Sequence, residues 1–249
     1  MSNADRKVAL VTGGATGIGR ACALQFARHG FDVAINYSRS ETEARETKQS
    51  LQDEGADAIA VQADVSQADQ VANLIATVND HFGRLDVLVN NAATTNFIDE
   101  RDLDAMTEDK WDRIFAVNVK GTFFCSRAAV ALLRENGGAI VNVSSVAGIS
   151  GNGSSIAYSA SKGAINTLTK TLARTLAPAI RVNAVLPGPV DSRWLRESMT
   201  DEEIQELAAD WPLPRPVHPN DVADTVFYLA TQTQHTTGQL LVLDGGRTM

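Results

Sequence analysis

The segment Val8-Ala9-Leu10-Val11-Thr12-Gly13-Gly14-Ala15-Thr16-Gly17-Ile18-Gly19 decides the fold of this chain. Its first four residues are apolar without a break, which predicts a strand covered on both faces of a sheet. A helical pattern begins at Ile18, so the glycines occupy the turn between a first strand and a first helix. A glycine-rich run is often only a turn. In this position, however, Gly13, Gly17 and Gly19 would let the backbone approach a pyrophosphate, which the free N–H groups of the helix N-terminus would bind.

The alternation of strand and helix continues along the whole chain. Apolar runs predict strands at Val8–Val11, Val33–Asn36, Ala58–Gln62, Val87–Val89, Ala139–Val143, Arg181–Leu186 and Leu240–Leu243. Amphipathic stretches predict helices near residues 18–29, 42–54, 67–82, 107–134, 157–177 and 220–231. Such βαβ units with short connections are typical of an α/β fold with a doubly wound parallel sheet and helices on both faces. No internal repeat, low-complexity tract or linker interrupts the pattern, so we expect one dinucleotide-binding domain over residues 1–249.

The composition argues against several classes of protein. The 249 residues include 30 Asp and Glu and 22 Lys and Arg, a net charge of −8, whereas a nucleic-acid-binding protein needs a basic face. The same charge disfavours an anionic membrane surface. No apolar run reaches the roughly 18 residues of a membrane span, and the first residues lack the order of a secretory signal. Cys22 and Cys125 give no disulfide framework, and neither they nor the four histidines have metal-ligand spacing. We therefore expect a cytoplasmic protein without a metal site.

Residues 187–219 depart from the alternation of strands and helices. Six of the seven prolines and two of the three tryptophans lie between Pro187 and Pro219. Ligands of open α/β sheets bind beyond the carboxyl ends of the strands, where a long excursion after a late strand could cover a substrate. The alternative is a packed surface loop that its prolines stiffen. Long connections in compact domains are usually functional or disordered, so we interpret residues 187–219 as a substrate-covering segment.

The end of the second predicted strand bears on the choice of nucleotide. NAD-binding sites usually place an Asp or Glu there, which binds the ribose 2′-hydroxyl. Here the stretch is Asn36-Tyr37-Ser38-Arg39, and Ser38 and Arg39 could bind a 2′-phosphate through charge-assisted hydrogen bonds. The alternative is that Arg39 is a solvated charge near Glu41 and that either nucleotide is accepted. The missing carboxylate favours NADP(H) over NAD(H).

The segment Tyr158-Ser159-Ala160-Ser161-Lys162 places a phenol and an amine four residues apart on a predicted helix. Residues with this spacing share one face, and the ammonium of Lys162 would lower the Tyr158 pKa from its ordinary value near 10 toward a range useful for acid–base catalysis. A Tyr and a Lys also occur four apart by chance. The pair becomes informative because Ser145, thirteen residues before Tyr158, follows a predicted strand.

Taken in order, these motifs resemble the short-chain dehydrogenase/reductase family over nearly the whole chain. The matching elements are Thr12–Gly19, Asp64, Asn90-Asn91-Ala92, Asn118, Ser145, Tyr158, Lys162 and Pro187-Gly188. Thr237-Gly238-Gln239 and Asp244-Gly245-Gly246 are most similar to the 3-oxoacyl-(acyl-carrier-protein) reductase and glucose dehydrogenase group. The resemblance implies a Rossmann-type sheet of seven parallel strands in the order 3-2-1-4-5-6-7, and a homotetramer.

The resemblance also implies catalytic roles for four side chains. Tyr158 would be the general acid that protonates a carbonyl oxygen while hydride arrives from the nicotinamide, and the base in the reverse direction. Ser145 would hydrogen-bond that oxygen, and Lys162 would bind the nicotinamide ribose and lower the Tyr158 pKa. Asn118 would hold a water that connects Lys162 to solvent. Taken alone, Asn118 could equally be a buried amide satisfied by local hydrogen bonds.

Further positions are implied to contact the cofactor. Asp64 would bind the adenine amino group, although Asp64 and Ser66 could instead cap the next helix. Asn90 would shape the cofactor channel, and the residues after the sixth strand would line the nicotinamide side. The expected cofactor contacts are Gly13, Thr16, Gly17, Ile18, Gly19, Ser38, Arg39, Asp64, Val65, Asn90, Ala92, Tyr158, Lys162, Pro187, Gly188, Val190 and Ser192.

The predicted reaction is the NADP(H)-dependent interconversion of a ketone, for example a 3-oxoacyl thioester, and a secondary alcohol. Reductases that act on acyl carrier protein tend to have basic residues before the fifth strand. Here that segment, Arg134–Gly138, is nearly neutral and only Arg174 follows it, which weakens a carrier-protein partner. The alternatives are a sugar or polyol dehydrogenase, a reductase of hydroxysteroid-like or xenobiotic ketones, and a nucleotide-binding regulatory protein without catalysis.

Overall fold

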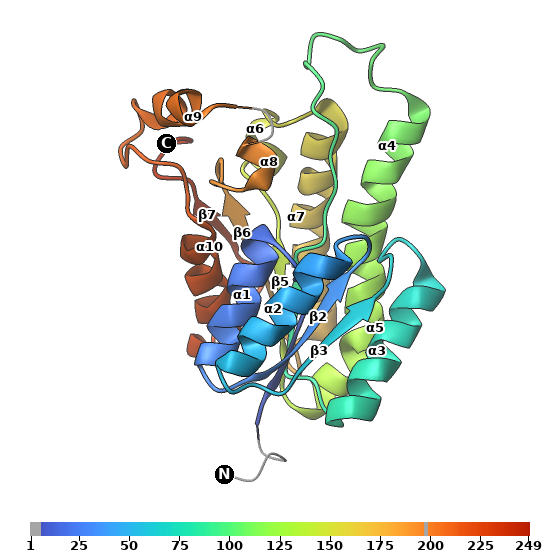
Figure 1. The fold of residues 1–249 in the computed structure, drawn as a ribbon. Coiled ribbons are helices and arrows are strands. Elements are labelled where there is room, and N and C mark those ends of the chain that lie inside the picture. The colour runs from blue at the N-terminus through green and yellow to red at the C-terminus, as the bar shows by residue number, and fades with distance from the viewer. Residues whose placement is uncertain (1–5, 197–198) are drawn as a thin grey trace.

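In the computed structural model, which describes residues 6–196 and 199–249, seven strands form one parallel sheet between two layers of helices (Figure 1). The strands are β1 (Val8–Val11), β2 (Asp32–Tyr37), β3 (Ala58–Gln62), β4 (Val87–Asn90), β5 (Ala139–Val143), β6 (Arg181–Pro187) and β7 (Leu240–Leu243). Their order is β3-β2-β1-β4-β5-β6-β7, and every neighbouring pair is parallel. The predicted fold class and strand order are confirmed.

Each face of the sheet has its own layer of helices and its own apolar core. The helices α1 (Gly17–Arg28), α2 (Glu41–Asp53) and α10 (Pro219–Phe227) cover one face. The helices α3 (Ala68–Phe82), α5 (Thr122–Glu135) and α7 (Ile156–Leu176) cover the other. Side chains alternate across each strand, so Ala9 and Val11 of β1 pack in the first core and Val8 and Leu10 in the second. Burial on both faces is why the strands read as unbroken apolar runs.

A single helix runs over Glu108–Glu135, 28 residues in length. It comprises α4 (Glu108–Phe115), a π-helical segment η2 (Ala116–Gly121) and α5. By length and apolar composition it could cross a membrane, but 44% of its most apolar window is buried inside the fold. Cys125, Ala129 and Leu133 belong to the core beneath the sheet. The helix is therefore weak evidence for a membrane span.

The sequence pattern missed three short helices: α6 (Ala147–Ser150), α8 (Arg193–Arg196) and α9 (Asp201–Ala208). The π-helical segment η3 (Tyr228–Gln232) continues α10, and the helix predicted near residues 220–231 covers both. Helices as short as the three missed ones carry too few turns to show a helical period. Two of them, α8 and α9, lie in the segment 187–219 and sit above the carboxyl ends of the strands (Figure 1). A bridge between Val190 and Val217 closes the base of this excursion. Residues 197–198, which the predicted substrate-covering segment includes, lie outside the described residues.

Candidate active site

A cavity of about 960 Å³ opens at the carboxyl ends of the strands. The strand order reverses between β1 and β4, so the connections after these strands diverge and leave a crevice, the usual ligand site of an open α/β sheet. Most of the predicted site residues line this cavity: Gly13, Thr16, Gly17, Ile18, Ser38, Arg39, Asp64, Val65, Ala92, Ser145, Tyr158, Lys162, Pro187, Gly188, Val190 and Ser192. Gly19, Asn90 and Asn118 lie behind this wall.

The glycine turn presents bare backbone to the cavity. Gly17, the first residue of α1, has a φ of 54°, and a Cβ built there would have no atom within 4 Å. A Cβ on Gly19 would lie 2.1 Å from the carbonyl oxygen of Gly13, so only glycine permits this close packing of helix on turn. Gly19 therefore serves the shape of the turn and does not line the cavity. The free N–H groups of the first turn of α1 point to where an anion would bind.

Asn91 follows the predicted site residue Asn90 at the end of β4, and its side chain is hydrogen-bonded to the glycine turn. Its Nδ2 donates to the carbonyl oxygens of Thr12 and Gly13, each at 3.0 Å. The Thr12 hydroxyl in turn accepts from the N–H groups of Asn91 and Ala92 at 3.0 and 3.1 Å. Asn90, which was predicted to contact the cofactor, does not reach the cavity. Its Nδ2 donates inward to Ser126 and Asn142, because successive strand residues point to opposite sides.

The predicted catalytic side chains converge on one wall. Tyr158 and Lys162 project from α7, and the Lys162 Nζ lies 5.4 Å from the centroid of the Tyr158 ring. This nitrogen donates a 2.8 Å hydrogen bond to the carbonyl oxygen of Val143 at the end of β5. The hydroxyl of Ser145 accepts from the N–H of Ala147 at 3.1 Å, which fixes the side chain just beyond the same strand. A strand end and a helix face thus hold all three groups.

Burial is the largest cause of the pKa shifts of Tyr158 and Lys162. It raises the pKa of Tyr158 to about 12, against an opposing hydrogen bond from Ser145. It also lowers the pKa of Lys162 to about 7, because the ammonium is desolvated. Lys162 is not among the causes of the Tyr158 shift in this geometry, so the predicted lowering of the Tyr158 pKa by Lys162 stays a prediction. Helical spacing shows that two groups are neighbours, but not how strongly burial disfavours their charged forms.

Asn118 sits in the π-helical segment η2 and is fully buried. Its Oδ1 accepts from the N–H of Thr94 at 2.8 Å, and its Nδ2 donates to the Thr94 carbonyl and to the Ser161 hydroxyl at 3.1 and 3.0 Å. The side chain therefore ties the connection after β4 to the helix of Tyr158. This is the locally satisfied amide considered above, and the predicted water-holding role stays a prediction.

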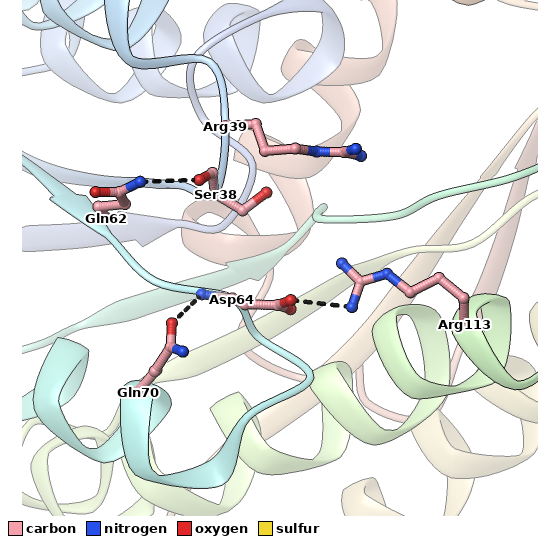
Figure 2. A pocket seen from close by; sticks show the side chains of 6 residues that line it. All are labelled: Ser38, Arg39, Gln62, Asp64, Gln70 and Arg113. Carbon is pink, nitrogen blue, oxygen red and sulfur yellow. Dashed lines mark hydrogen bonds and ion pairs between the residues drawn. The ribbon is translucent and has the colours of Figure 1, made fainter.

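A smaller pocket of about 430 Å³ lies beside the ends of β2 and β3 (Figure 2). It is lined by Ser38, Arg39, Gln62, Asp64, Gln70 and Arg113. Arg39 forms no hydrogen bond or ion pair through its side chain with any residue that the structure describes, and Glu41 pairs with Arg45 at 2.5 Å. An exposed Arg39 without a partner agrees both with a phosphate-binding role and with the alternative of a solvated charge near Glu41, so both stay predictions. Sequence reasoning missed Arg113, because no local pattern relates it to Asp64, 49 residues earlier.

Asp64 is engaged locally but does not cap the next helix. One of its oxygens accepts from both the N–H and the hydroxyl of Ser66, at 2.9 and 2.7 Å. The other accepts from Nη1 of Arg113 at 2.9 Å. The N-cap of α3 is Gln67. The predicted contact between Asp64 and an adenine amino group stays a prediction.

Several apolar side chains also line the cavity. Phe97 lines it from the connection after β4, and Leu195, Met199 and Leu207 line it from the segment 187–219. These side chains face the same space as Tyr158. An apolar portion of a ligand could therefore lie here while a polar group reached the catalytic wall.

Known proteins show the same architecture and extended sequence similarity. A family model described as enoyl-(acyl carrier protein) reductase matches residues 13–248. The chain is 43% identical over 244 residues to "Granaticin polyketide synthase putative ketoacyl reductase 2" of Streptomyces violaceoruber, covering 97% of this chain and 96% of that protein. It is 41% identical over 246 residues to the 3-oxoacyl-(acyl-carrier-protein) reductase FabG of Staphylococcus aureus, covering 98% of each. The crystal structure of "a putative short-chain dehydrogenase/reductase from Burkholderia xenovorans" matches with a TM-score of 0.92 and 37% identity, over 97% of this chain and 98% of that one.

Proposed function

Because this chain belongs to the short-chain dehydrogenase/reductase family and is an oxidoreductase acting on CH–OH or C=O groups, we propose that it interconverts a ketone and a secondary alcohol with NADP(H). The observation that carries the proposal is the shared cavity. Ser145, Tyr158 and Lys162 line the same space as the glycine turn and the end of β2. A nucleotide bound along the strand ends would meet a carbonyl group held by these side chains.

The residues present fit NADP(H). The open space above Gly17 and the N-terminus of α1 suit a pyrophosphate. Ser38 and Arg39 are exposed at the end of β2, and the Arg39 guanidinium is uncommitted among the described residues, as a 2′-phosphate site requires. When bound, the nicotinamide supplies or accepts the hydride.

The protein's own part is to orient the carbonyl and to manage one proton. The Ser145 hydroxyl would donate a hydrogen bond to the carbonyl oxygen, which gains negative charge as reduction proceeds. Tyr158, whose pKa is raised to about 12, is protonated at neutral pH and would donate its proton to that oxygen. Lys162, whose pKa is lowered to about 7, can gain or lose a proton at Nζ under the same conditions and would return one toward Tyr158.

We propose 3-oxoacyl thioesters as the substrate class. The names of the two relatives above describe reductases of oxoacyl or ketoacyl groups, and the apolar wall of Phe97, Leu195 and Met199 suits an acyl chain. Family membership disfavours the non-catalytic alternative, and the alternative of a sugar or polyol dehydrogenase is left to the experiment. The acyl carrier protein, the homotetramer and the cytoplasmic location stay predictions.

The test is a nucleotide titration followed by turnover. We expect NADPH to bind more tightly than NADH, and NADPH to be consumed with an acetoacetyl thioester but not with a sugar lactone. Arg39→Ala should weaken NADPH binding much more than NADH binding. Equal losses for the two nucleotides would remove the 2′-phosphate role. Turnover confined to polyols would instead support the alternative that the protein is a polyol dehydrogenase.

A further inference from the structure

The pocket at the ends of β2 and β3 holds a carboxylate where the proposed function needs an anion to bind. Asp64 lines the same pocket as Ser38 and Arg39, and Figure 2 shows its carboxylate pointing toward the Arg113 guanidinium. Burial alone would raise the pKa of Asp64. The hydrogen bonds from Ser66, and then that from Arg113, outweigh burial and lower it. Asp64 is therefore ionised at neutral pH and adds a negative charge to the pocket.

An unscreened carboxylate here would discriminate between the two nucleotides. A phosphate monoester carries between one and two negative charges at pH 7, and a nearby carboxylate repels it. The free 2′-hydroxyl of NAD(H) can instead donate a hydrogen bond to a carboxylate. Asp64 without a partner would thus favour NAD(H), against the preference proposed from Ser38 and Arg39.

Arg113 supplies the opposing charge from a different element. It projects from α4, and its Nη1 donates to Asp64 at 2.9 Å and to Ser66 at 3.1 Å. Its side chain is 45% exposed and that of Asp64 is 27% exposed, so the pair lies at the pocket mouth. With Arg39, the pocket contains two guanidinium groups and one carboxylate, a local excess of positive charge in a chain whose net charge is −8.

We propose that Arg113 is a specificity-determining residue for the nucleotide: by pairing with Asp64 it cancels the carboxylate charge beside Ser38 and Arg39 and so allows the pocket to accept a 2′-phosphate. The proposal rests on the proposed use of NADP(H). It gives Arg113 a role beyond joining α4 to the end of β3. A purely structural pair would affect both nucleotides equally, because both share the adenosine and the pyrophosphate.

The experiment measures dissociation constants for NADPH and NADH by energy transfer from tryptophan to the nicotinamide. Arg113→Ala should weaken NADPH roughly fivefold, an effect near the upper end for a partly exposed ion pair, and leave NADH unchanged or slightly tighter. Arg113→Lys, which keeps the charge, should recover most of the preference. Arg28→Ala is the matched control, since Arg28 and Glu54 form a similarly exposed pair at 2.8 Å outside both pockets.

A double-mutant cycle tests the screening directly. In the Asp64→Asn background the carboxylate charge is gone, so adding Arg113→Ala should leave the ratio of the two dissociation constants unchanged. Adenosine 2′,5′-bisphosphate and 5′-AMP, used as competitors, should show the same pattern, which confines the effect to the 2′ position. Thermal unfolding of each variant shows whether it is folded.

The outcomes separate this inference from the proposed function. If the wild type prefers NADPH and Arg39→Ala removes the preference, but Arg113→Ala weakens both nucleotides equally, the inference fails and the proposed cofactor stands. If Arg113→Ala lowers the preference for NADPH over NADH as much in the Asp64→Asn background as in the wild type, Arg113 acts without screening Asp64. That result would overturn the inference. A wild type that prefers NADH would overturn both.

Discussion

Replacing Gly17 with alanine separates the backbone strain of the glycine turn from its contact with a ligand. Gly17 has a φ of 54°, where an alanine costs about 1–2 kcal/mol. The built Cβ meets no atom within 4 Å, so strain is the whole expected effect on the folded protein. For a chain of this size, that loss lowers Tm by about 2–8 °C.

The same methyl group would stand in the cavity where the backbone must approach the pyrophosphate. Gly17→Ala should therefore weaken NADPH and NADH by a similar factor, at least about tenfold or 1.4 kcal/mol, because both carry the pyrophosphate. Gly83→Ala is the matched control. Gly83 ends α3 with a φ of 71°, has no atom within 4 Å of its built Cβ, and lines neither pocket.

The assay pairs thermal unfolding with nucleotide titration for both variants. Both should lose similar stability, and only Gly17→Ala should lose affinity. If Gly17→Ala bound NADPH as the wild type does, the pyrophosphate would not lie over the first turn of α1. If Gly83→Ala lost as much affinity, the effect would arise from general destabilisation and the reasoning from the turn would be refuted.

Three further predictions concern the catalytic wall. Tyr158→Phe should reduce turnover about 10²- to 10⁴-fold while the NADPH dissociation constant stays within twofold; a variant with more than a tenth of wild-type turnover would show that another group supplies the proton. The Lys162 pKa is about 7 in the fold and 10.5 in a model peptide, so between these values the unfolded chain binds the extra proton and stability rises with pH. The unfolding free energy of the wild type should thus rise relative to Lys162→Met from pH 7 to 10, and a flat difference in denaturant titrations would contradict this. Asn118→Ala should cost about 1–3 kcal/mol in the same titrations, because it leaves buried partners at Thr94 and Ser161 without their hydrogen bonds.

The strands could be predicted because burial leaves a local pattern in the sequence, whereas their order came from the family resemblance. A parallel strand covered on both faces must be apolar throughout, and β1, β4 and β5 are buried along their whole lengths. The positions of Tyr158 and Lys162 on one face of α7 follow equally from helical spacing. These features depend on residues close together in the sequence.

The parts that could not be predicted depend on contacts between distant segments. Arg113 reaches Asp64 only because α4 packs beside the end of β3, and Asn91 reaches the glycine turn only because β4 lies next to β1. The sign of the Tyr158 pKa shift also depends on burial by the whole fold. Motifs indicate which residues take part, whereas charge balance and protonation arise from the assembled site.

The two halves of the cavity differ in how they are built, which explains why the reaction class can be predicted and the substrate cannot. The nucleotide half is formed largely by turns at the ends of buried strands, where a change would disturb the sheet. The substrate half is formed by Phe97 and by residues of α8 and α9. The segment that carries these two helices is joined to the rest of the fold by contacts such as the Val190–Val217 bridge, the hydrogen bond from Leu213 to Gly245 and the Arg193–Glu43 ion pair, none of which involves the catalytic wall. Leu195 and Leu207 could therefore be replaced without moving Ser145 or Tyr158. Substrate choice can diverge on this side while the proton-handling groups stay in place.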